Sequence, residues 1–250
     1  FNESGALKWR WRPADDQNLP SAYRSMGLSE VKPLNGGKWI GVVGGYNWAI
    51  VDTSTHQAVG WGDATGNPHS IELLPNGILA VVSTSNAFAE SGANSVHLYD
   101  ISGDRIRNPS QQNHATFHTA SGHTFDAPHG IHWDAATQKL WVGGSDGLNK
   151  CTVGYSAGTF TLTVDQNWPT VVGGVTCTEA HDLRPVPGTT KLVMTTIEKV
   201  IFFDMKNECW LPDETLGYGL VKCFDPSATG RRFLVQVPNH SWNTDVLWLY

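Results

Sequence analysis

The sequence carries little charge and contains no long hydrophobic run. Only 16% of its 250 residues are Asp, Glu, Lys or Arg, and the formal net charge is -6. Nucleic-acid-binding proteins usually present basic surfaces, so a mildly acidic chain is not expected to bind nucleic acid. No apolar run approaches the ~20 residues that a membrane-spanning helix requires. The sequence therefore predicts neither a nucleic-acid partner nor a membrane partner.

Other absences narrow the fold class and the chemistry. No helical spacing of apolar residues is sustained along the chain, which argues against an α-helical fold. No two cysteines stand in a CxxC pair, so a zinc knuckle is not expected. The sequence has instead 26 glycines and 13 prolines, set between short apolar runs. This composition is typical of many short strands joined by turns.

Five stretches of the chain share one pattern of a strand, a turn and a second strand. Three of them begin with histidine and read HSIELLPNGILAVVSTS, HGIHWDAATQKLWVGGS and HDLRPVPGTTKLVMTTI. Weaker copies begin at Ser29 and Val221. Three of the copies are followed by an apolar strand that ends in an aspartate before a polar turn, namely Asp52, Asp100 and Asp204. A carboxylate at that place accepts hydrogen bonds from the backbone of the turn.

Repeats of about 40 to 60 residues built from short strands are typical of a β-propeller, in which each repeat is one four-stranded blade. The pattern predicts an all-β fold, a five-bladed β-propeller that forms a single domain over residues 1–250. The last copy has three strands, so we expect an N-terminal strand near Lys8 to Arg12 to complete it by pairing with Asp245 to Tyr250. Six blades are the alternative, with a further blade in the insertion from Arg105 to Asp126.

Several features together favour a secreted, extracellular protein. The sequence begins with Phe1 instead of Met, which we interpret as a processed N-terminus whose signal peptide has been removed. An even number of cysteines suits disulfides in an oxidising compartment. We predict the pairs Cys151–Cys177 and Cys209–Cys223, although other pairings remain possible because connectivity cannot be read from a sequence. Two sequons predict glycosylation at Asn2 and Asn239. We expect a monomer.

The candidate site rests on three histidines at one position of the repeat. His69, His129 and His181 each begin the first strand of their copy. In a propeller the first strand of each blade lines the central channel, so the three side chains are predicted to converge at one mouth. Three imidazoles suit a divalent transition metal such as zinc, manganese, iron or copper. Without a metal they suit acid–base catalysis or anion recognition.

Other polar residues are predicted near the same mouth. Glu30 follows the start of the first copy, Asp182 follows His181, and Lys222 begins the fifth copy with a register uncertain by a residue or two. Glu30 and Asp182 form the one carboxylate pair that the pattern places together, and Lys222 would offset the charge of an acidic substrate. Three more histidines lie in the longest insertion, either as a flap over the site or as part of a solvated loop: His114, His118 and His123.

The segments NPHSIELLPNGILAVVS, APHGIHWDAATQKLWVGG, AHDLRPVPGTTKLVMTT and SWNTDVLWLY, with the opening KWRWRP, carry a family resemblance. Nearly the whole chain resembles a family of secreted bacterial and fungal β-propeller proteins known as a domain of unknown function. The resemblance implies a propeller fold and secretion. It implies no activity, so the chemistry must come from the residues.

The sequence thus favours an extracellular carbohydrate-active enzyme, a lyase or a hydrolase for a glycan that contains uronic acid. A histidine of the trio would move the proton, while a metal or Lys222 would offset the substrate carboxylate. One alternative is a non-catalytic sugar-binding propeller. It predicts equivalent pockets in every repeat, whereas the first copy has Ser29 where three others have histidine. A second alternative is a metal-dependent lactonase or oxygenase that uses the same histidines.

Overall fold

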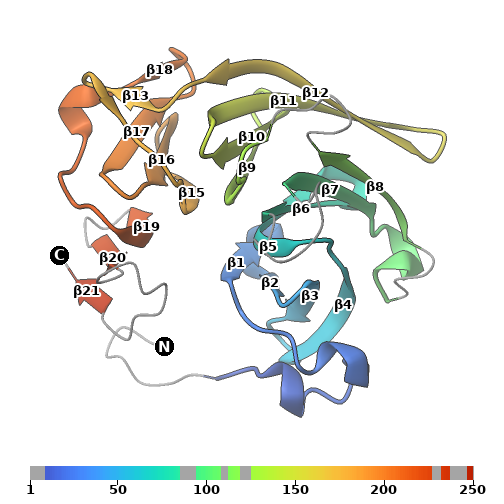
Figure 1. The fold of residues 1–250 in the computed structure, drawn as a ribbon. Coiled ribbons are helices and arrows are strands. Elements are labelled where there is room, and N and C mark those ends of the chain that lie inside the picture. The colour runs from blue at the N-terminus through green and yellow to red at the C-terminus, as the bar shows by residue number, and fades with distance from the viewer. Residues whose placement is uncertain are drawn as a thin grey trace. The chain divides into compact units, whose positions relative to one another are not determined.

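The regular structure of the chain is almost entirely antiparallel β-sheet. The computed structural model describes residues 9–84, 94–107, 112–118, 125–226, 232–236 and 247–249. The chain divides into two compact units, Phe1–Thr116 and Phe117–Tyr250 (Figure 1). The prediction of an all-β fold is confirmed, and that of a single domain stays a prediction.

The first unit contains two four-stranded sheets, each a meander whose strands pair in sequence order. The strands are β1 (Glu30–Leu34), β2 (Trp39–Gly44), β3 (Asn47–Asp52) and β4 (Gln57–Asp63), then β5 (Asn67–Leu74), β6 (Ile78–Thr84), β7 (Ser95–Asp100) and β8 (Asn113–His118). The described part of the insertion after Arg105 supplies β8, an outer strand of the second sheet. It therefore adds a strand to an existing sheet and gives no support to a sixth blade.

The second unit repeats the same plan. Two further four-stranded meanders are followed by a three-stranded sheet, and a two-stranded hairpin is inserted between the meanders. The strands are β9 (Gly130–Asp134), β10 (Lys139–Gly144), β11 (Gly147–Ser156), β12 (Thr159–Trp168), β13 (Val171–Val172), β14 (Val175–Thr176), β15 (Asp182–Pro185), β16 (Lys191–Thr195), β17 (Val200–Asp204), β18 (Cys209–Trp210), β19 (Val221–Pro226), β20 (Arg232–Gln236) and β21 (Leu247–Leu249). Each predicted repeat thus corresponds to one sheet.

Short 3-10 helices occupy connections between strands. They are η1 (Pro13–Asp15), η2 (Ser21–Tyr23), η3 (Asn35–Gly37), η4 (Pro75–Gly77), η5 (Gly103–Arg107) and η8 (Pro212–Glu214). The predicted aspartate turns are confirmed. Each carboxylate accepts the backbone N–H two residues further on, at 2.8 Å from Ser54 to Asp52, 3.0 Å from Ser102 to Asp100 and 2.9 Å from Lys206 to Asp204. Hydrogen bonds from Ser54 hold the pKa of Asp52 below its ordinary value.

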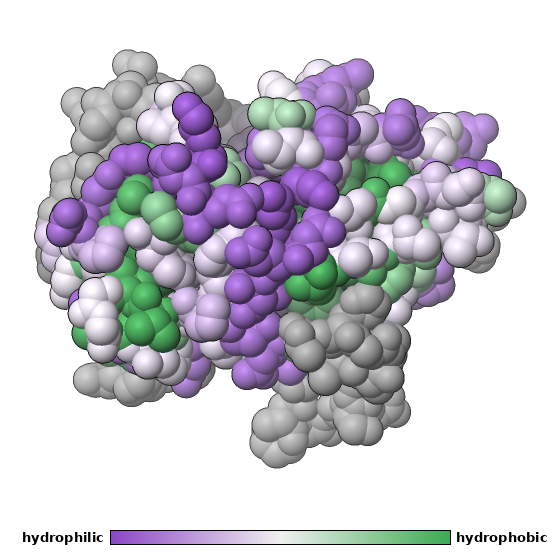
Figure 2. Space-filling model, turned by 90° about the horizontal axis from the view of Figure 1, so that it is seen from above, coloured by the Kyte–Doolittle hydropathy of each residue, from purple (hydrophilic) through white to green (hydrophobic). Residues whose placement is uncertain are grey.

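The core lies between the faces of consecutive sheets. In the first unit, one cluster joins residues of the β1–β4 sheet, including Trp48 and Ile50, to residues of the β5–β8 sheet, including Leu79 and Tyr99. In the second unit, a cluster around Trp141 and Phe203 joins the β9–β12 sheet to the β15–β18 sheet. The face drawn in Figure 2 is largely hydrophilic, with smaller apolar patches between the polar areas. Sheets stacked face to face around buried aromatic residues are what the repeat predicted.

The N-terminal segment does not form the predicted closing strand. Trp9 to Arg12 belong to no strand. Instead, Trp9 stacks on His56 with ring centroids 4.7 Å apart, and the Trp11 indole Nε1 donates to Asp16 Oδ2 at 2.7 Å. These contacts hold the segment against the first unit. Closure through these residues is therefore not found, while Lys8, Asp245 and Tyr250 lie outside the described residues.

The two predicted disulfides are wrong. Cys151, Cys177 and Cys209 are free thiols, so neither pair is formed. Cys209 lies on the outer strand β18, whereas Cys223 lies on β19, which packs against β15 and β16. In this sheet β18 lies two strand spacings from β16 and three from β15, at about 4.8 Å each. A disulfide needs Cα atoms within about 7 Å. The sequons at Asn2 and Asn239 lie outside the described residues.

Candidate functional site

The histidine position of the repeat is a defined place in the sheet. The backbone N–H of His129 donates to Gly143 O, and that of His181 donates to Thr195 O, both at 2.9 Å. Each of these histidines directly precedes the first residue of an inner strand, Gly130 of β9 or Asp182 of β15. His69 occupies the same place in β5, but there it is the extra residue of a β-bulge between Pro68 and Ser70. His129 and His181 thus lie directly before their inner strands, whereas His69 is the third residue of its strand. That the three histidines form one site stays a prediction.

Lys222 occupies the histidine position of the last sheet. Strand β19 has a bulge between Val221 and Cys223, with Lys222 as the extra residue. This is the arrangement of His69 in β5. A bulge inserts one residue into a strand and redirects its side chain. The sequence pattern left the register of Lys222 open by a residue or two, and the bulge supplies the reason for that shift.

Within the second unit, the residues that directly precede the inner strands β9 and β15 come together. The rings of His129 and His181 meet edge to face, with centroids 5.2 Å apart and an angle of 87° between their planes. His129 Nδ1 lies 2.8 Å from the carbonyl oxygen of Ala127. A carbonyl only accepts, so we assign the proton to Nδ1, which leaves Nε2 as the acceptor of the neutral ring.

The surroundings keep both imidazoles neutral. Burial is the largest cause that lowers the pKa of His129 to about 4, opposed by the bond to Ala127 and assisted by the charge of Lys222. Burial, then Lys222, then His129 lower the pKa of His181 to about 3. Burial also lowers the pKa of Lys222, although Asp182 acts in the opposite direction. The three side chains therefore form one electrostatically coupled group, with a single cation beside two neutral rings.

The two predicted carboxylates have a structural role. Glu30 Oε2 accepts the backbone N–H of Ile71 at 3.0 Å, and Asp182 Oδ2 accepts that of Phe224 at 3.3 Å. The two acids occupy the same register position, directly after the histidine position, and each reaches the inner strand of the next sheet. Asp182 Oδ2 also accepts from Arg184 Nε at 2.7 Å. Glu30 and Asp182 belong to different units, and their pairing near one mouth stays a prediction.

In the first unit, His69 is held by its own sheet. Its Nε2 lies 3.0 Å from Asn67 Nδ2 and 3.1 Å from Thr84 Oγ1. Among the described residues, no group of three or more His, Cys, Asp or Glu side chains is placed to hold a metal ion. A metal held jointly by His69, His129 and His181 therefore stays a prediction.

The histidines of the insertion include a strand residue. His114 lies on β8 and stacks on Tyr99 with centroids 5.7 Å apart, while the side chain of His118 and all of His123 lie outside the described residues. His114 also lines a polar pocket of about 230 Å³ beside His97. His97, which is buried and lies 3.0 Å from Thr116 Oγ1, was not singled out by the sequence pattern.

A serine motif in the second unit is not a nucleophile site. Gly143 to Gly147 read G-G-S-D-G, which matches the G-x-S-x-G pattern of α/β-hydrolases. That pattern needs a sharp turn from a strand into a helix. Ser145 instead lies in the tight turn between β10 and β11, which pair antiparallel, and its N–H donates to Asp126 O at 2.8 Å.

Comparisons with known proteins support the fold. No family model matches the chain, and no curated protein matches it. The β-propeller domain of Cps50 (Swd1) from Myceliophteria thermophila is similar in structure, with a TM-score of 0.57 and 12% identity over 89% of this chain and 69% of that one. A protein from Lactobacillus plantarum has a TM-score of 0.59 and 12% identity over 85% of this chain and 64% of that one. The likeness shows a β-propeller type of fold, and the family resemblance stays a prediction.

No described helix has the length and apolar character needed to cross a membrane.

Proposed function

We propose that this chain is a carbohydrate-active enzyme that acts on a glycan containing uronic acid, and that His129, His181 and Lys222 form its site. The observation that carries the proposal is the edge-to-face pair of imidazoles, whose ring centroids are 5.2 Å apart and whose pKa values are lowered mainly by burial and further by the charge of Lys222. A neutral base beside a buried ammonium group is the combination that acid–base chemistry on an anionic sugar requires.

The charges favour a substrate that carries a carboxylate. Lys222 is largely removed from solvent, and its pKa is lowered by that burial. A bound carboxylate would stabilise its ammonium form, because an opposite charge at close range favours the ionised state. The same carboxylate would raise the low pKa values of the two histidines, which strengthens them as bases once substrate is present.

Of the two reactions, β-elimination suits these residues better than hydrolysis. In elimination, a neutral imidazole takes the proton from C5 of the uronate, and the electron pair forms the C4–C5 double bond. The bond from C4 to the glycosidic oxygen breaks, and that oxygen takes a proton. His129 Nε2 is our candidate base, and Lys222 neutralises the carboxylate that makes C5 acidic. Hydrolysis commonly uses two carboxylates, and Glu30 and Asp182 are both engaged in bonds between sheets.

A non-catalytic sugar-binding protein is the second candidate. The pKa values of about 4 and about 3 favour it, because such imidazoles are weak bases in the empty site. It uses the same three side chains to bind the uronate without turnover. The two candidates differ only in whether a product forms.

Incubation with polygalacturonate, alginate and glucuronan tests both candidates, with the ultraviolet absorbance of unsaturated ends as the readout. We expect product with at least one polymer, and its loss in His129→Ala, His181→Ala and Lys222→Met. The exposed His114 and the half-buried Lys191, which pairs with Glu214, provide matched controls as His114→Ala and Lys191→Met. Binding without product would support the sugar-binding protein. Neither binding nor product with any acidic polymer would overturn the proposal.

We also propose that the four four-stranded sheets and the three-stranded sheet are the five blades of one closed propeller. Support comes from the shared meander order and from the inner-strand start that recurs in every repeat. A compact domain of this length has a radius of gyration of about 18 Å, which small-angle scattering measures directly. A clearly larger value would contradict closure. The extracellular location stays a prediction.

A further inference from the structure

The second unit has a pocket at the ends of the strands opposite to the histidines. It is enclosed by three turns, those between β9 and β10, β15 and β16, and β17 and β18, and its volume is about 420 Å³. We propose that this pocket is a second binding site and that it takes a neutral sugar residue. The volume lies within the ~300–1,000 Å³ of typical small-molecule sites.

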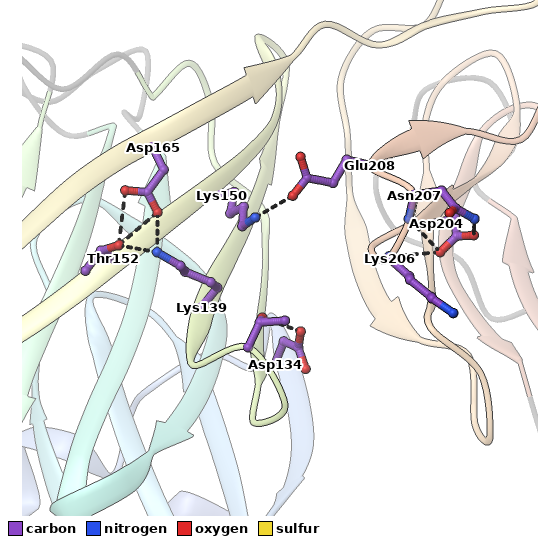
Figure 3. A network of polar contacts seen from close by, with 10 residues as sticks. Asp134, Lys139, Lys150, Thr152, Asp165, Asp204, Lys206, Asn207 and Glu208 are labelled. Carbon is purple, nitrogen blue, oxygen red and sulfur yellow. Dashed lines mark hydrogen bonds and ion pairs between the residues drawn. The ribbon is translucent and has the colours of Figure 1, made fainter.

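An ion pair spans the pocket from one sheet to the next. Lys150 Nζ on β11 lies 2.5 Å from Glu208 Oε1 in the turn before β18. Figure 3 shows these two side chains reaching toward each other from separate sheets, with Lys206 on the Glu208 side and Asp134 on the Lys150 side. Both ends of the pair line the pocket, as do Lys206 and Asp134. Charged groups of both signs are therefore available to a ligand.

Part of this polar lining is already used by the protein. Asp134 accepts from the backbone of Ala136 at 3.0 Å and from Thr137 Oγ1 at 2.5 Å. Thr190 donates to Asp204 at 2.9 Å. By contrast, neither the Lys206 ammonium group nor Glu208 Oε2 has a hydrogen-bond partner within the described ranges. One strong donor and one strong acceptor thus remain for a ligand.

A buried aromatic side chain also lines the pocket. Trp141 lines the pocket and is only 1% exposed, and its Nε1 has no hydrogen-bond partner in the described part of the chain. Buried polar groups are nearly always satisfied by protein or by ordered water. The Lys150 ammonium group lies 5.8 Å from the centre of the same ring. Trp141 therefore brings an aromatic ring with a lysine beside it into the lining of the pocket.

The balance of charge selects a neutral polyhydroxyl ligand. Lys150 and Lys206 are matched by Asp134 and Glu208, so the lining has no net charge. A free anion would be repelled by Glu208, whereas a sugar hydroxyl can donate to Glu208 and accept from a lysine. Met205 gives the pocket an apolar wall for the C–H face of a pyranose ring.

Calorimetry with cellotetraose, xylotetraose and β-1,4-galactotetraose tests the proposal. We expect at least one of them to bind with one site per chain, and Glu208→Gln and Lys206→Gln each to weaken binding by about tenfold or more, as loss of a charged hydrogen bond does. Glu214→Gln is the matched control, because Glu214 pairs with Lys191 of β16 and neither residue lines the pocket. His129→Ala should leave this binding unchanged, so the outcome is separate from that of the proposed enzyme site.

Nitrogen-15 NMR of the indole groups gives a direct readout. The Nε1–H signal of Trp141, assigned by its loss in Trp141→Phe, should shift when the sugar binds. The proposal fails if no neutral tetrasaccharide binds, or if binding is as tight in Glu208→Gln and Lys206→Gln as in the wild type. Binding of inorganic sulfate that depends on Lys206 but is improved by Glu208→Gln would identify an anion site and overturn the neutral sugar.

Discussion

Glu30 accepts a hydrogen bond from the backbone N–H of Ile71 at 3.0 Å and so ties the inner strand β1 to the inner strand β5. Asp182 makes the same bond to Phe224 in the second unit. A carboxylate directly after the histidine position thus satisfies an N–H on the free edge of the next inner strand. This bond gives a structural reason for an acidic residue at that position of the repeat.

Removing one of these hydrogen bonds between a carboxylate and a backbone N–H should lower stability and leave the proposed chemistry intact. We expect Glu30→Ala to reduce the free energy of unfolding by about 1–3 kcal/mol, because it leaves a part-buried N–H without its acceptor. Glu30→Gln keeps an acceptor and should cost less. Urea denaturation measures both. If Glu30→Ala abolished turnover at unchanged stability, the structural role would be wrong.

At the corresponding position in the third repeat, Gly130 should tolerate no side chain. A Cβ there would lie 2.4 Å from the Cβ and 2.6 Å from the N of Leu183 in the next sheet. We expect Gly130→Ala to destabilise the protein by about 1–3 kcal/mol through overpacking. Gly217→Ala is the matched control, since nothing lies within 4 Å of its added carbon. Equal melting temperatures for the two variants would contradict this packing.

The buried imidazoles should make stability fall in mild acid. In the unfolded chain a histidine takes up a proton below about pH 6.5, whereas in the folded protein the pKa of His129 is about 4. This difference in pKa adds to the free energy of unfolding above pH 6.5. The added stability, on the order of 3 kcal/mol, is lost as the pH falls from 6.5 to 4. Comparison with His129→Gln isolates this effect from that of the carboxyl groups. If the free energy of unfolding of the wild type changed with pH in parallel to that of His129→Gln, His129 would not be buried as described.

The pH dependence of catalysis should follow the same groups. The value of kcat/KM reports the free enzyme, so its acid limb should lie near pH 4, where His129 becomes protonated. Its alkaline limb should lie below 10.5, the ordinary pKa of lysine, because burial lowers that of Lys222. The alkaline limb should disappear in any residual activity of Lys222→Met. An acid limb near 6.5 would indicate a solvated histidine as the base.

Metal dependence separates the proposed site from a metal centre. The charge of Lys222 lowers the pKa of both imidazoles, and it acts in the same sense against a divalent cation. We expect dialysis against a chelator to leave activity unchanged, and we expect Lys222→Met to bind zinc more tightly than the wild type. Elemental analysis that finds one metal per wild-type chain, with activity lost on its removal, would instead support the three-histidine metal site.

The sequence by itself determined the local features of this protein. Alternating apolar residues and turn residues predicted the start of each inner strand, including those after His129 and His181, because strand direction and turn chemistry depend on neighbouring residues. The aspartate turns at Asp52 and Asp204 were predicted for the same reason. The sheet order within each repeat followed, since short turns oblige consecutive strands to pair.

Only the tertiary structure decided what those residues contact. The contact between His129 and His181, the bond from Asp182 to Phe224 and the free thiol of Cys177 all depend on how neighbouring sheets pack. A bulge fixed the position of Lys222, because one extra residue shifts the register of a strand and every side chain after it. The pocket of Lys150 and Glu208 joins turns distant in sequence. Residues far apart in the chain meet through packing between sheets, which the periodicity of one strand does not encode.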